Sequence, residues 1–537
     1  MSLETIIKRL QHSSSSSLPL YPALDGLRGV AILLVVLGHF WSIAAGSLTD
    51  RPEVVFFGID ITWPFQLAGH GVRLFFIMSA FLLYIPYASA ALLDAPHPNT
   101  IQFYLRRFNR IYPAYLALTL TYVLAVAILG SVIVAPLPSI LNIAANLLFL
   151  HPIAVFVPES SVSPDILQGT WSLVVEVYFY ALLPILAYLF RRLSVHIVLS
   201  LAMIGVATYY RGVLYPLIGA MELPWQQRSV LLFNPLPNLD SFAIGMLSAR
   251  LFVWWRSVPG TMFWHAPFIL AFTGLAGMSF LFLFPYSLPP LEIAAGLRID
   301  SNFWFNLSAG TLIVGMLLRK SLVTAIFSIE ELRFIGVISY SLFLINVTFG
   351  QFVAIPIMHA LGLTGFTARF AILISICIPA CILLSTVLYI FLERPWLTRQ
   401  PIGVGLREAA STTADMLRQL SFRACVIVAL SLYGAGSLLH YGLAKPVAIS
   451  GEILFKTADF SDANWTLGVS TRGHVLLVPF EASLFVTLKE KTHLVLEDGS
   501  RVGIQAVVDA GQGWIHVHTA TVNPVLMSYP HRLIGVR

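Results

Sequence analysis

The chain has 537 residues, of which 57 % are hydrophobic and only 11 % are Asp, Glu, Lys or Arg. Because soluble domains carry about 25 % charged residues, this composition excludes a soluble globular protein and indicates many membrane-spanning segments. Basic residues at cytoplasmic loop ends explain the net charge of +6, so we expect a lipid bilayer and no nucleic acid among the partners. The cysteines all lie in apolar runs and form neither a spaced metal motif nor a disulfide framework; they are Cys377, Cys381 and Cys425.

The chain begins with a short polar segment and continues with a series of apolar stretches. Residues 1–23 contain a serine run and no signal-peptide core, so they predict a flexible cytoplasmic lead. Stretches of spanning length then recur. We predict eleven transmembrane helices, at residues 24–44, 70–93, 112–135, 171–190, 194–210, 236–255, 265–286, 302–318, 334–358, 368–391 and 421–442. The shorter apolar run 140–157 predicts a re-entrant or interfacial helix.

The distribution of Lys and Arg orients these helices. With the N-terminus in the cytoplasm, sixteen Lys or Arg residues fall in inner segments and four in outer loops. Because cytoplasmic loops are enriched in Lys and Arg, this asymmetry favours a cytoplasmic N-terminus. We therefore expect a multi-pass membrane protein, whose eleventh helix brings the C-terminal segment to the extracytoplasmic side.

The pattern changes after the tenth predicted helix. Residues 397–420 are polar and Arg-bearing and predict a cytoplasmic linker before the helix at 421–442. Beyond it, runs such as HVLLVPF and GWIHVHT alternate like strands, and EDGS is typical of a hairpin turn. Residues 448–537 therefore predict a small β-rich soluble domain outside the membrane.

This C-terminal segment contains two groups of residues with an open role. His516 and His518 project from one strand face, where they either bind a metal or are simply exposed. Trp465, Trp514 and Tyr529 either stack on sugars or pack in a core.

The first predicted helix contains ionisable residues inside the apolar run ALDGLRGVAILLVVLGHF. Eleven steps of about 100° carry the chain from Arg28 to His39, so both side chains share one helix face, about 16 Å apart along the axis. Charged residues in a membrane are costly and usually face a cavity with a function. Together with Asp25, the pair predicts a functional site; the alternative is a satisfied polar pair between packed helices.

A second basic motif, FYLRRFNRIYPAYL, lies at the cytoplasmic start of the third predicted helix. Arg107 and Arg110 are three residues apart and face the same way, with Arg106 beside them. Guanidinium groups bind phosphate through paired hydrogen bonds, so these residues and Arg28 predict a phosphate-binding cluster. The alternative is ordinary cytoplasmic loop charge.

A third motif, GTWSLVVEVYFY, opens the fourth predicted helix at Trp171 and Ser172. Glu176 is then about 7 Å from the outer end of its helix, and His39 is about as deep in the first helix. We therefore expect the two in one layer, as a general base with its orienting carboxylate. The alternative is two unrelated buried polar groups.

Six motifs taken in order resemble the acyltransferase-3 family of membrane acyltransferases. They are DGLRGVAILLVVLGHF, GVRLFFIMSAFLL at 71–83, RRFNRIYPAY, TWSLVVEVYFY, ISYSLFLIN at 338–346 and FLERPW at 391–396. The resemblance covers residues 24–396. It implies ten core helices and transfer of an acyl group, usually acetyl, from cytoplasmic acyl-CoA to an extracytoplasmic glycan or lipid-linked sugar. It implies acyl-CoA as a co-substrate, and we expect no tightly bound cofactor and no metal.

The resemblance also implies roles for particular residues. His39 is implied in catalysis, and the arginines of the two basic motifs in acyl-CoA handling. The candidate site residues are His39 and Glu176 for catalysis, Arg28, Arg106, Arg107 and Arg110 for donor binding, and Asp25, Trp171 and Ser172 in support. The chain departs from the family pattern at Ala80, where Gly is commoner, and at Asn346, where this helix often has His.

Two functions compete at this stage. The first is an O-acyltransferase of a bacterial inner membrane acting on exopolysaccharide, lipopolysaccharide or a lipid-linked sugar, with polysaccharide assembly machinery as a candidate partner. The second is a proton-coupled or anion transporter that uses Arg28, His39 and Glu176 as a relay. The predicted spans show no paired halves, which counts against a transporter. The fold expected in either case is an all-α polytopic membrane bundle of about eleven helices, ten of them in the acyltransferase core, plus the small β-rich domain.

Overall fold

The computed structural model describes Ile7, most of residues 21–398 and seven strands between residues 464 and 536. Within 21–398 the description omits residues 46–54, 57–58, 61–67, 134–136, 155–165, 168, 222, 224, 259–264, 284–290, 295–296 and 364–365. Everything stated below concerns the described residues.

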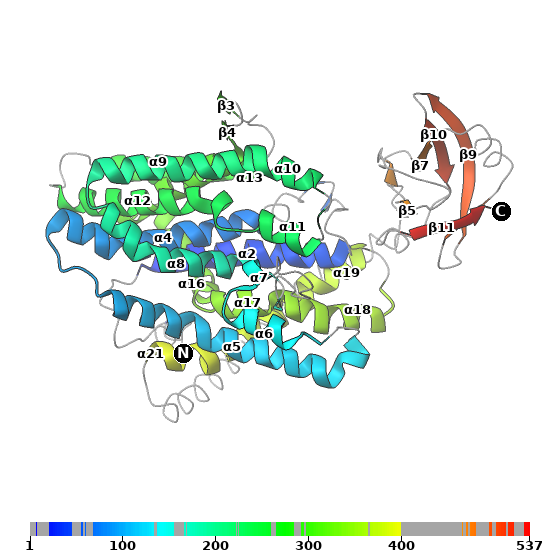
Figure 1. Cartoon of the computed structure of the whole chain (residues 1–537), viewed down its shortest axis with the longest axis horizontal. Coiled ribbons are helices and arrows are strands. Elements are labelled where there is room, and N and C mark those ends of the chain that lie inside the picture. The colour runs from blue at the N-terminus through cyan, green and yellow to red at the C-terminus, as the bar shows by residue number, and fades with distance from the viewer. Residues whose placement is uncertain are drawn as a thin grey trace. The chain divides into compact units, whose positions relative to one another are not determined.

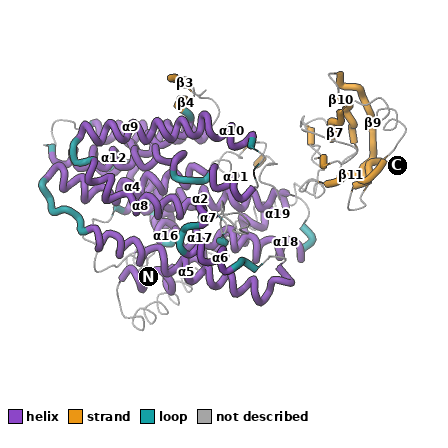
Figure 2. Tube along the Cα trace, in the orientation of Figure 1, coloured by secondary structure: helices purple, strands orange, loops and turns teal. Residues whose placement is uncertain are grey.

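Helices make up most of this part of the chain (Figures 1 and 2). The longer ones are α2 (Pro22–Ala45), α4 (Ala68–Leu93), α5 (Thr100–Ile133), α8 (Trp171–Leu189), α9 (Leu193–Tyr209), α12 (Leu239–Ser257), α13 (Ala266–Leu283), α14 (Ser301–Leu318), α17 (Ser339–Phe349) and α20 (Ile378–Leu388). Shorter helices connect them: α6 (Ile140–Leu147), α7 (His151–Ala154), α10 (Tyr215–Ala220), α11 (Trp225–Leu232), α15 (Leu322–Phe327), α16 (Glu330–Val337), α18 (Ile355–Ala360), α19 (Phe366–Ile372) and α21 (Arg394–Thr398). Tighter or wider turns interrupt or join several of these, at η1 (Tyr210–Leu214), η2 (Leu236–Asn238), η3 (Gly350–Ala354), η4 (Leu373–Cys377) and η5 (Tyr389–Glu393).

The described residues contain 9 helical segments that are long and apolar enough to span a membrane, and a shorter apolar helix at Ala266–Leu281. The prediction of a helical multi-pass bundle is thus confirmed for this part of the chain. The third segment begins at Thr100 rather than at residue 112, so the arginine motif lies within the helix and not before it. The run 140–157 forms two short helices, α6 and α7. The predicted eleventh helix at 421–442 lies outside the described residues.

Helix α2 approaches α15 and α16 backbone to backbone, and two glycines make this possible. A Cβ built on Gly26 would lie 1.7 Å from the carbonyl oxygen of Phe327, and one on Gly336 would lie 1.7 Å from that of Asp25. Neither position therefore tolerates a side chain without a backbone shift. This close contact fixes the turn of α2 that carries Arg28. Elsewhere α12 packs along α4, and α13 along α14.

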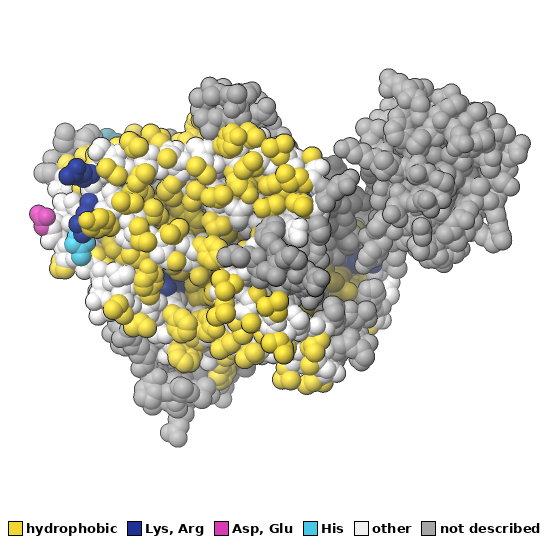
Figure 3. All heavy atoms as spheres, in the orientation of Figure 1, with side chains coloured by type: hydrophobic (Ala, Val, Ile, Leu, Met, Phe, Trp, Pro, Cys, Tyr) yellow, Lys and Arg dark blue, Asp and Glu magenta, His cyan; other side chains and the backbone are white. Residues whose placement is uncertain are grey.

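The outer surface of the bundle is apolar, as a lipid-facing surface must be. Large hydrophobic side chains stand exposed along the helices, for example Ile128, Ile185 and Leu201, which are 68 %, 60 % and 61 % exposed. Figure 3 shows hydrophobic side chains over most of one face of the bundle, with Lys and Arg gathered at one end. Because continuous apolar patches of this extent are rare on soluble proteins, the surface agrees with a membrane location.

The strands are short hairpins within the helical part and a sheet near the C-terminus. The hairpins pair β1 (Val55–Phe56) with β2 (Ile59–Asp60) and β3 (Leu291–Ala294) with β4 (Leu297–Ile299). The 7-stranded sheet has the order β5-β11-β8-β9-β10-β7-β6. Its strands are β5 (Asn464–Trp465), β6 (Val469–Ser470), β7 (Gly473–Pro479), β8 (His493–Leu496), β9 (Arg501–Gly511), β10 (Trp514–Thr519) and β11 (His531–Val536). The extent of a β-rich domain over 448–537 stays a prediction, as do the boundaries at 1–23, 24–396 and 397–420.

Candidate functional site

A polar pocket opens inside the helical bundle, and three of the four predicted arginines line it. Its polar lining residues are Arg28, Ser79, Arg107, Arg110, Ser172, Glu176, Tyr180, Ser339 and Tyr340. They come from α2, α4, α5, α8 and α17, so five helices converge on one site. The cavity measures about 90 Å³, well below the roughly 300–1,000 Å³ of small-molecule sites. In this state only part of a nucleotide-sized ligand fits.

Two of the pocket arginines, Arg28 and Arg107, face a carboxylate or an aromatic ring. Arg28 Nη1 lies 3.4 Å from Asp25 Oδ1, one turn away on the same helix. Arg107 stands over the ring of Tyr180, 5.8 Å from its centroid, and also interacts electrostatically with Glu176. Its Nε is buried and has no hydrogen-bond partner among the described residues. A guanidinium held in this way still has donors to offer to an anion.

Arg106 does not join this cluster. Its side chain is exposed, and its Nη2 donates to Gln102 Oε1 one turn away, at 3.1 Å. The helix explains the difference, because successive residues are about 100° apart while residues three apart share a face. Arg107 and Arg110 therefore point into the pocket and Arg106 points away.

Glu176 lies in the arginine pocket and not beside His39. Its Oε1 accepts from Ser79 Oγ at 2.5 Å and from the hydroxyl of Tyr180. The residue level with His39 is instead Gly169, since a Cβ built there would lie 3.6 Å from His39 Cε1. Glu176 is about two helical turns farther along α8, roughly 10 Å away at 1.5 Å per residue. The expected pairing of Glu176 with His39 in one layer is therefore wrong.

Glu176 and His39 lie at different depths because the C-terminal end of α2 and the start of α8 are not level in the bundle. Gly169, beside His39, precedes the start of α8 at Trp171, whereas α2 continues beyond His39 to Ala45. Counting residues from the outer end of each helix assumed that the C-terminal end of α2 and the start of α8 lie at the same depth.

The hydrogen-bond partner of His39 is Asn346 of α17, with 2.6 Å between His39 Nδ1 and Asn346 Oδ1. Gly169, next to the imidazole, adopts φ +88, a backbone conformation that side chains rarely allow. The same helix α17 reaches the pocket: Ser339, Tyr340 and Phe343 line it, and Asn346 follows Phe343 by about one turn. Helix α17 thus connects the arginine pocket with His39.

The remaining predicted site residues divide in the same way. Ser172 is buried and lines the pocket. Trp171 does not line it; its ring packs against Phe233 at a centroid distance of 5.0 Å. Asp25 contacts Arg28 as described, so the first motif supplies both an arginine and its carboxylate.

Glu393, in the motif FLERPW, belongs to this site although the sequence analysis did not single it out. It is 2 % exposed, and its Oε1 accepts a hydrogen bond from Ser341 of α17. It is also the opposite charge that interacts most strongly with Arg110. A carboxylate at the end of a long apolar run was the signal that could have found it, because such residues are costly in a membrane.

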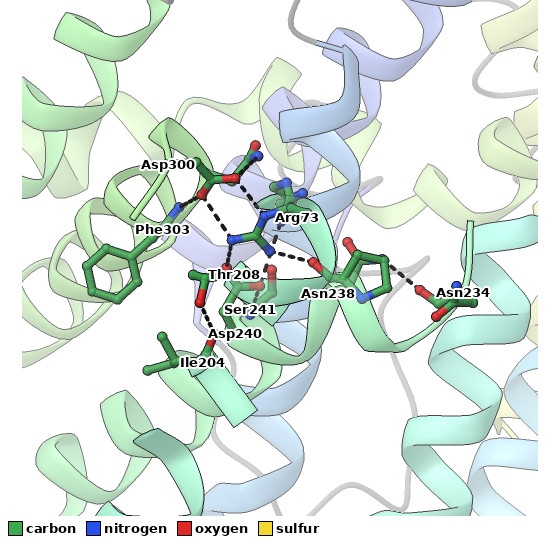
Figure 4. Close-up of polar contacts among 12 residues, drawn as sticks. Arg73, Ile204, Thr208, Asn234, Asn238, Asp240, Ser241, Asp300 and Phe303 are labelled. Atoms are coloured by element: carbon green, nitrogen blue, oxygen red, sulfur yellow. Dashed lines mark hydrogen bonds and ion pairs between the residues drawn. The ribbon is translucent and has the colours of Figure 1, made fainter. Parts of the chain in front are cut away.

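A second polar cluster is formed around Arg211, and Figure 4 shows its members Arg73, Asp240 and Asp300. Arg211 binds Asp300 through Nε and Nη2 at 2.6 and 2.9 Å and binds Asp240 at 2.8 Å, while Arg73 lies 3.8 Å from Asp240. Burial raises the pKa of Asp300, but the Arg211 guanidinium outweighs burial and leaves that pKa below its usual value. None of these four residues lines the arginine pocket. Two arginines and two aspartates balance in charge, so the cluster serves to tie α4, η1, α12 and the start of α14 together.

The structure describes no metal site. Within the described residues no group of three or more His, Cys, Asp or Glu is placed to hold a metal ion. His516 and His518 lie in β10, but their side chains are outside the described part of the chain, as are those of Trp465, Trp514 and Tyr529.

The sequence matches the family described as an acyltransferase domain, acyltransferase 3, over residues 21–390, which is more than half of the chain. The chain belongs to the acyltransferase-3 family. No curated protein and no solved structure was found to match it. Family membership makes the chain a membrane acyltransferase, and the match covers the arginine pocket and His39 with its partner Asn346.

Proposed function

We propose that this acyltransferase moves an acyl group, acetyl in the first instance, from cytoplasmic acyl-CoA to a hydroxyl of an extracytoplasmic glycan. The observation that carries the proposal is the continuity between the arginine pocket and His39 along α8 and α17. One end offers cationic donors for an anionic ligand and the other offers a base, as a transfer between two substrates requires.

The donor is assigned to the arginine end. Arg28, Arg107 and Arg110 suit phosphate oxygens, because guanidinium groups form paired, charge-assisted hydrogen bonds with them. The excess of Lys and Arg in the segments on the side of Arg28 supports a cytoplasmic location for this end. Since the cavity is small, a bound acyl-CoA would keep its bulky nucleotide near the surface and extend its narrow arm inward.

The chemistry is assigned to His39. Its Nε2 would accept the proton of the sugar hydroxyl while the oxygen attacks the thioester carbonyl. The carbon–sulfur bond then breaks, and the departing thiolate takes that proton from the imidazolium, which leaves an ester, free CoA and a neutral histidine. Glu176 acts at the donor end in this scheme, where it balances the charge of Arg107.

The proposal for the acceptor rests on the predicted membrane topology. An eleventh helix at 421–442 would place residues 448–537 outside the cytoplasm, where a small domain would contact exopolysaccharide, lipopolysaccharide or a lipid-linked sugar. Polysaccharide assembly machinery of the inner membrane is the corresponding candidate partner.

Release of free thiol from acetyl-CoA by the purified protein in detergent tests the proposal. We expect thiol release that depends on the protein and increases with a glycan acceptor, and its loss in His39→Ala with acetyl-CoA binding intact. A general base contributes about 10²–10⁴-fold to rate. Absence of thiol release from a folded wild-type protein that also fails to bind acetyl-CoA would contradict the proposal and favour a transport function.

A further inference from the structure

The side-chain amide of Asn346 can take only one orientation. Asn346 is fully buried, and its Nδ2 donates to the backbone carbonyls of Leu342 and Phe343 at 3.1 and 2.7 Å. Because carbonyl oxygens accept hydrogen bonds and never donate them, the NH2 of the amide must face these two groups. The amide oxygen is therefore turned toward His39, at 2.6 Å from Nδ1.

This orientation determines which nitrogen of His39 carries the proton. An amide oxygen only accepts, so Nδ1 of His39 must be the donor in the contact. A neutral imidazole has a single N–H, and the partner of one ring nitrogen thereby sets the state of the other. With the proton on Nδ1, Nε2 has a free lone pair.

We propose that Asn346 is the positioning residue of the transfer reaction, holding His39 in the tautomer whose Nε2 can act as the base. This inference rests on the proposed function and replaces the role first expected for Glu176. An uncharged partner suits an apolar site, because it directs the ring without adding a second buried charge. Asn346 thus takes, as a neutral amide, the place that a carboxylate has in many catalytic triads.

The surroundings of His39 leave Asn346 as its dominant polar partner. Among the described residues, no charged or titratable side chain interacts with the imidazole, and Asn346 is the only side chain recorded as its hydrogen-bond partner. A change in the charge of residue 346 should therefore be felt directly by His39.

Two substitutions separate positioning from packing. Asn346→Leu keeps the branched shape of the side chain and removes the acceptor, whereas Asn346→Asp keeps an acceptor for Nδ1 and adds a negative charge that stabilises the imidazolium. Asn306→Leu is the matched control, because Asn306 is equally buried in α14 and its amide atoms have no hydrogen-bond partner in the described part of the chain.

The first readout is the pH profile of acetyl transfer. We expect Asn346→Leu to lower kcat by about 10- to 100-fold, the scale found when a metal-binding histidine loses the partner that orients it, with KM for acetyl-CoA unchanged. Asn346→Asp should retain more activity than Asn346→Leu and move the acidic limb of the profile to higher pH. Asn306→Leu should leave both the limb and kcat as in wild type, even if it alters stability.

The second readout needs no substrate and so separates this inference from the proposed function. Diethyl pyrocarbonate modifies unprotonated imidazole, and its reaction at His39 can be followed by peptide mass as a function of pH. We expect the midpoint of that reaction to move to higher pH in Asn346→Asp and to stay unchanged in Asn306→Leu. If the midpoint moves but the protein transfers no acyl group, the coupling of Asn346 to His39 stands and the acyltransferase mechanism fails. An unchanged midpoint and unchanged kcat in folded Asn346 variants would overturn the inference.

Discussion

Replacing Arg211 by Leu should destabilise the bundle more than any change of a surface arginine. Arg211 is 8 % exposed and donates to Asp300, Asp240 and the carbonyl of Pro237, the last at 2.5 Å. The substitution leaves Arg73 as the remaining arginine beside the two carboxylates, and its distance of 3.8 Å from Asp240 gives little charge compensation.

The expected magnitude follows from the burial of the two carboxylates. Removing one partner of a buried ion pair costs about 3–5 kcal/mol, because the other charge stays buried without compensation. The side chain of Asp240 is 0 % exposed, whereas that of Asp300 is 23 % exposed and keeps part of its hydration. We therefore expect a loss of about 3 kcal/mol, at the lower end of that range. Adding Asp240→Asn to Arg211→Leu should recover part of the loss, since it removes the more deeply buried carboxylate.

Denaturation in mixed detergent micelles measures this free energy of unfolding. Arg228→Leu is the control, because the partners of the Arg228 guanidinium within the described residues are backbone carbonyls, at 3.1 Å for Met221 and 3.5 Å for Leu223. Hydrogen bonds to charged groups contribute about 1.5–3 kcal/mol. Because the contact with Met221 is exposed to solvent and its loss leaves no buried charge, we expect Arg228→Leu to cost no more than the lower end of that range. Equal free energies of unfolding for the two single variants, or a double variant less stable than Arg211→Leu, would show that Arg211 does not compensate the buried aspartates.

Three further predictions follow from the site and the topology. Arg110→Ala should weaken acetyl-CoA binding by about 10- to 100-fold, the scale of a lost charged hydrogen bond, while Arg106→Ala should leave binding unchanged. If isothermal titration calorimetry gave equal losses of affinity for the two variants, the assignment of the pocket would be contradicted. Gly336→Ala should destabilise the protein by at least about 1–3 kcal/mol, because the new Cβ would lie 1.7 Å from the carbonyl oxygen of Asp25; wild-type unfolding behaviour would argue against the close helix contact. A cysteine placed at Ser500 should react with an impermeant thiol reagent in intact spheroplasts, and labelling only after lysis would place the C-terminal segment in the cytoplasm.

Local features of the sequence predicted the helices and one face of the site. Apolar runs of spanning length identified the helical segments, because a bilayer demands a fixed length of apolar chain. The spacing of Arg107 and Arg110 predicted their common direction, and the structure shows both lining the pocket. Because adjacent residues of a helix are about 100° apart, the same spacing also predicts that Arg106 does not share the direction of Arg107.

Contacts between distant segments could not be predicted in this way. The depth of Glu176 depends on where α8 begins relative to α2, which packing and not hydropathy decides. His39 and Asn346 are separated by 307 positions, and neither helix alone indicates that they meet. Glu393 was visible as a carboxylate in an apolar segment, but only the fold brings it to Arg110. The presence of helical segments is therefore readable from composition, whereas their exact ends and the partners of a buried polar group depend on the packing of the whole bundle.

The mass profile of the cell's glycans tests the central claim most directly. Cells that lack this gene would be complemented with wild type, with His39→Ala or with an empty vector, and expression of both proteins in the membrane would be verified. The account predicts that acyl substituents on an extracytoplasmic glycan disappear without the gene, return with wild type and fail to return with His39→Ala. An identical glycan profile in all three strains, or full restoration by His39→Ala, would contradict an acyl transfer to glycan that depends on His39.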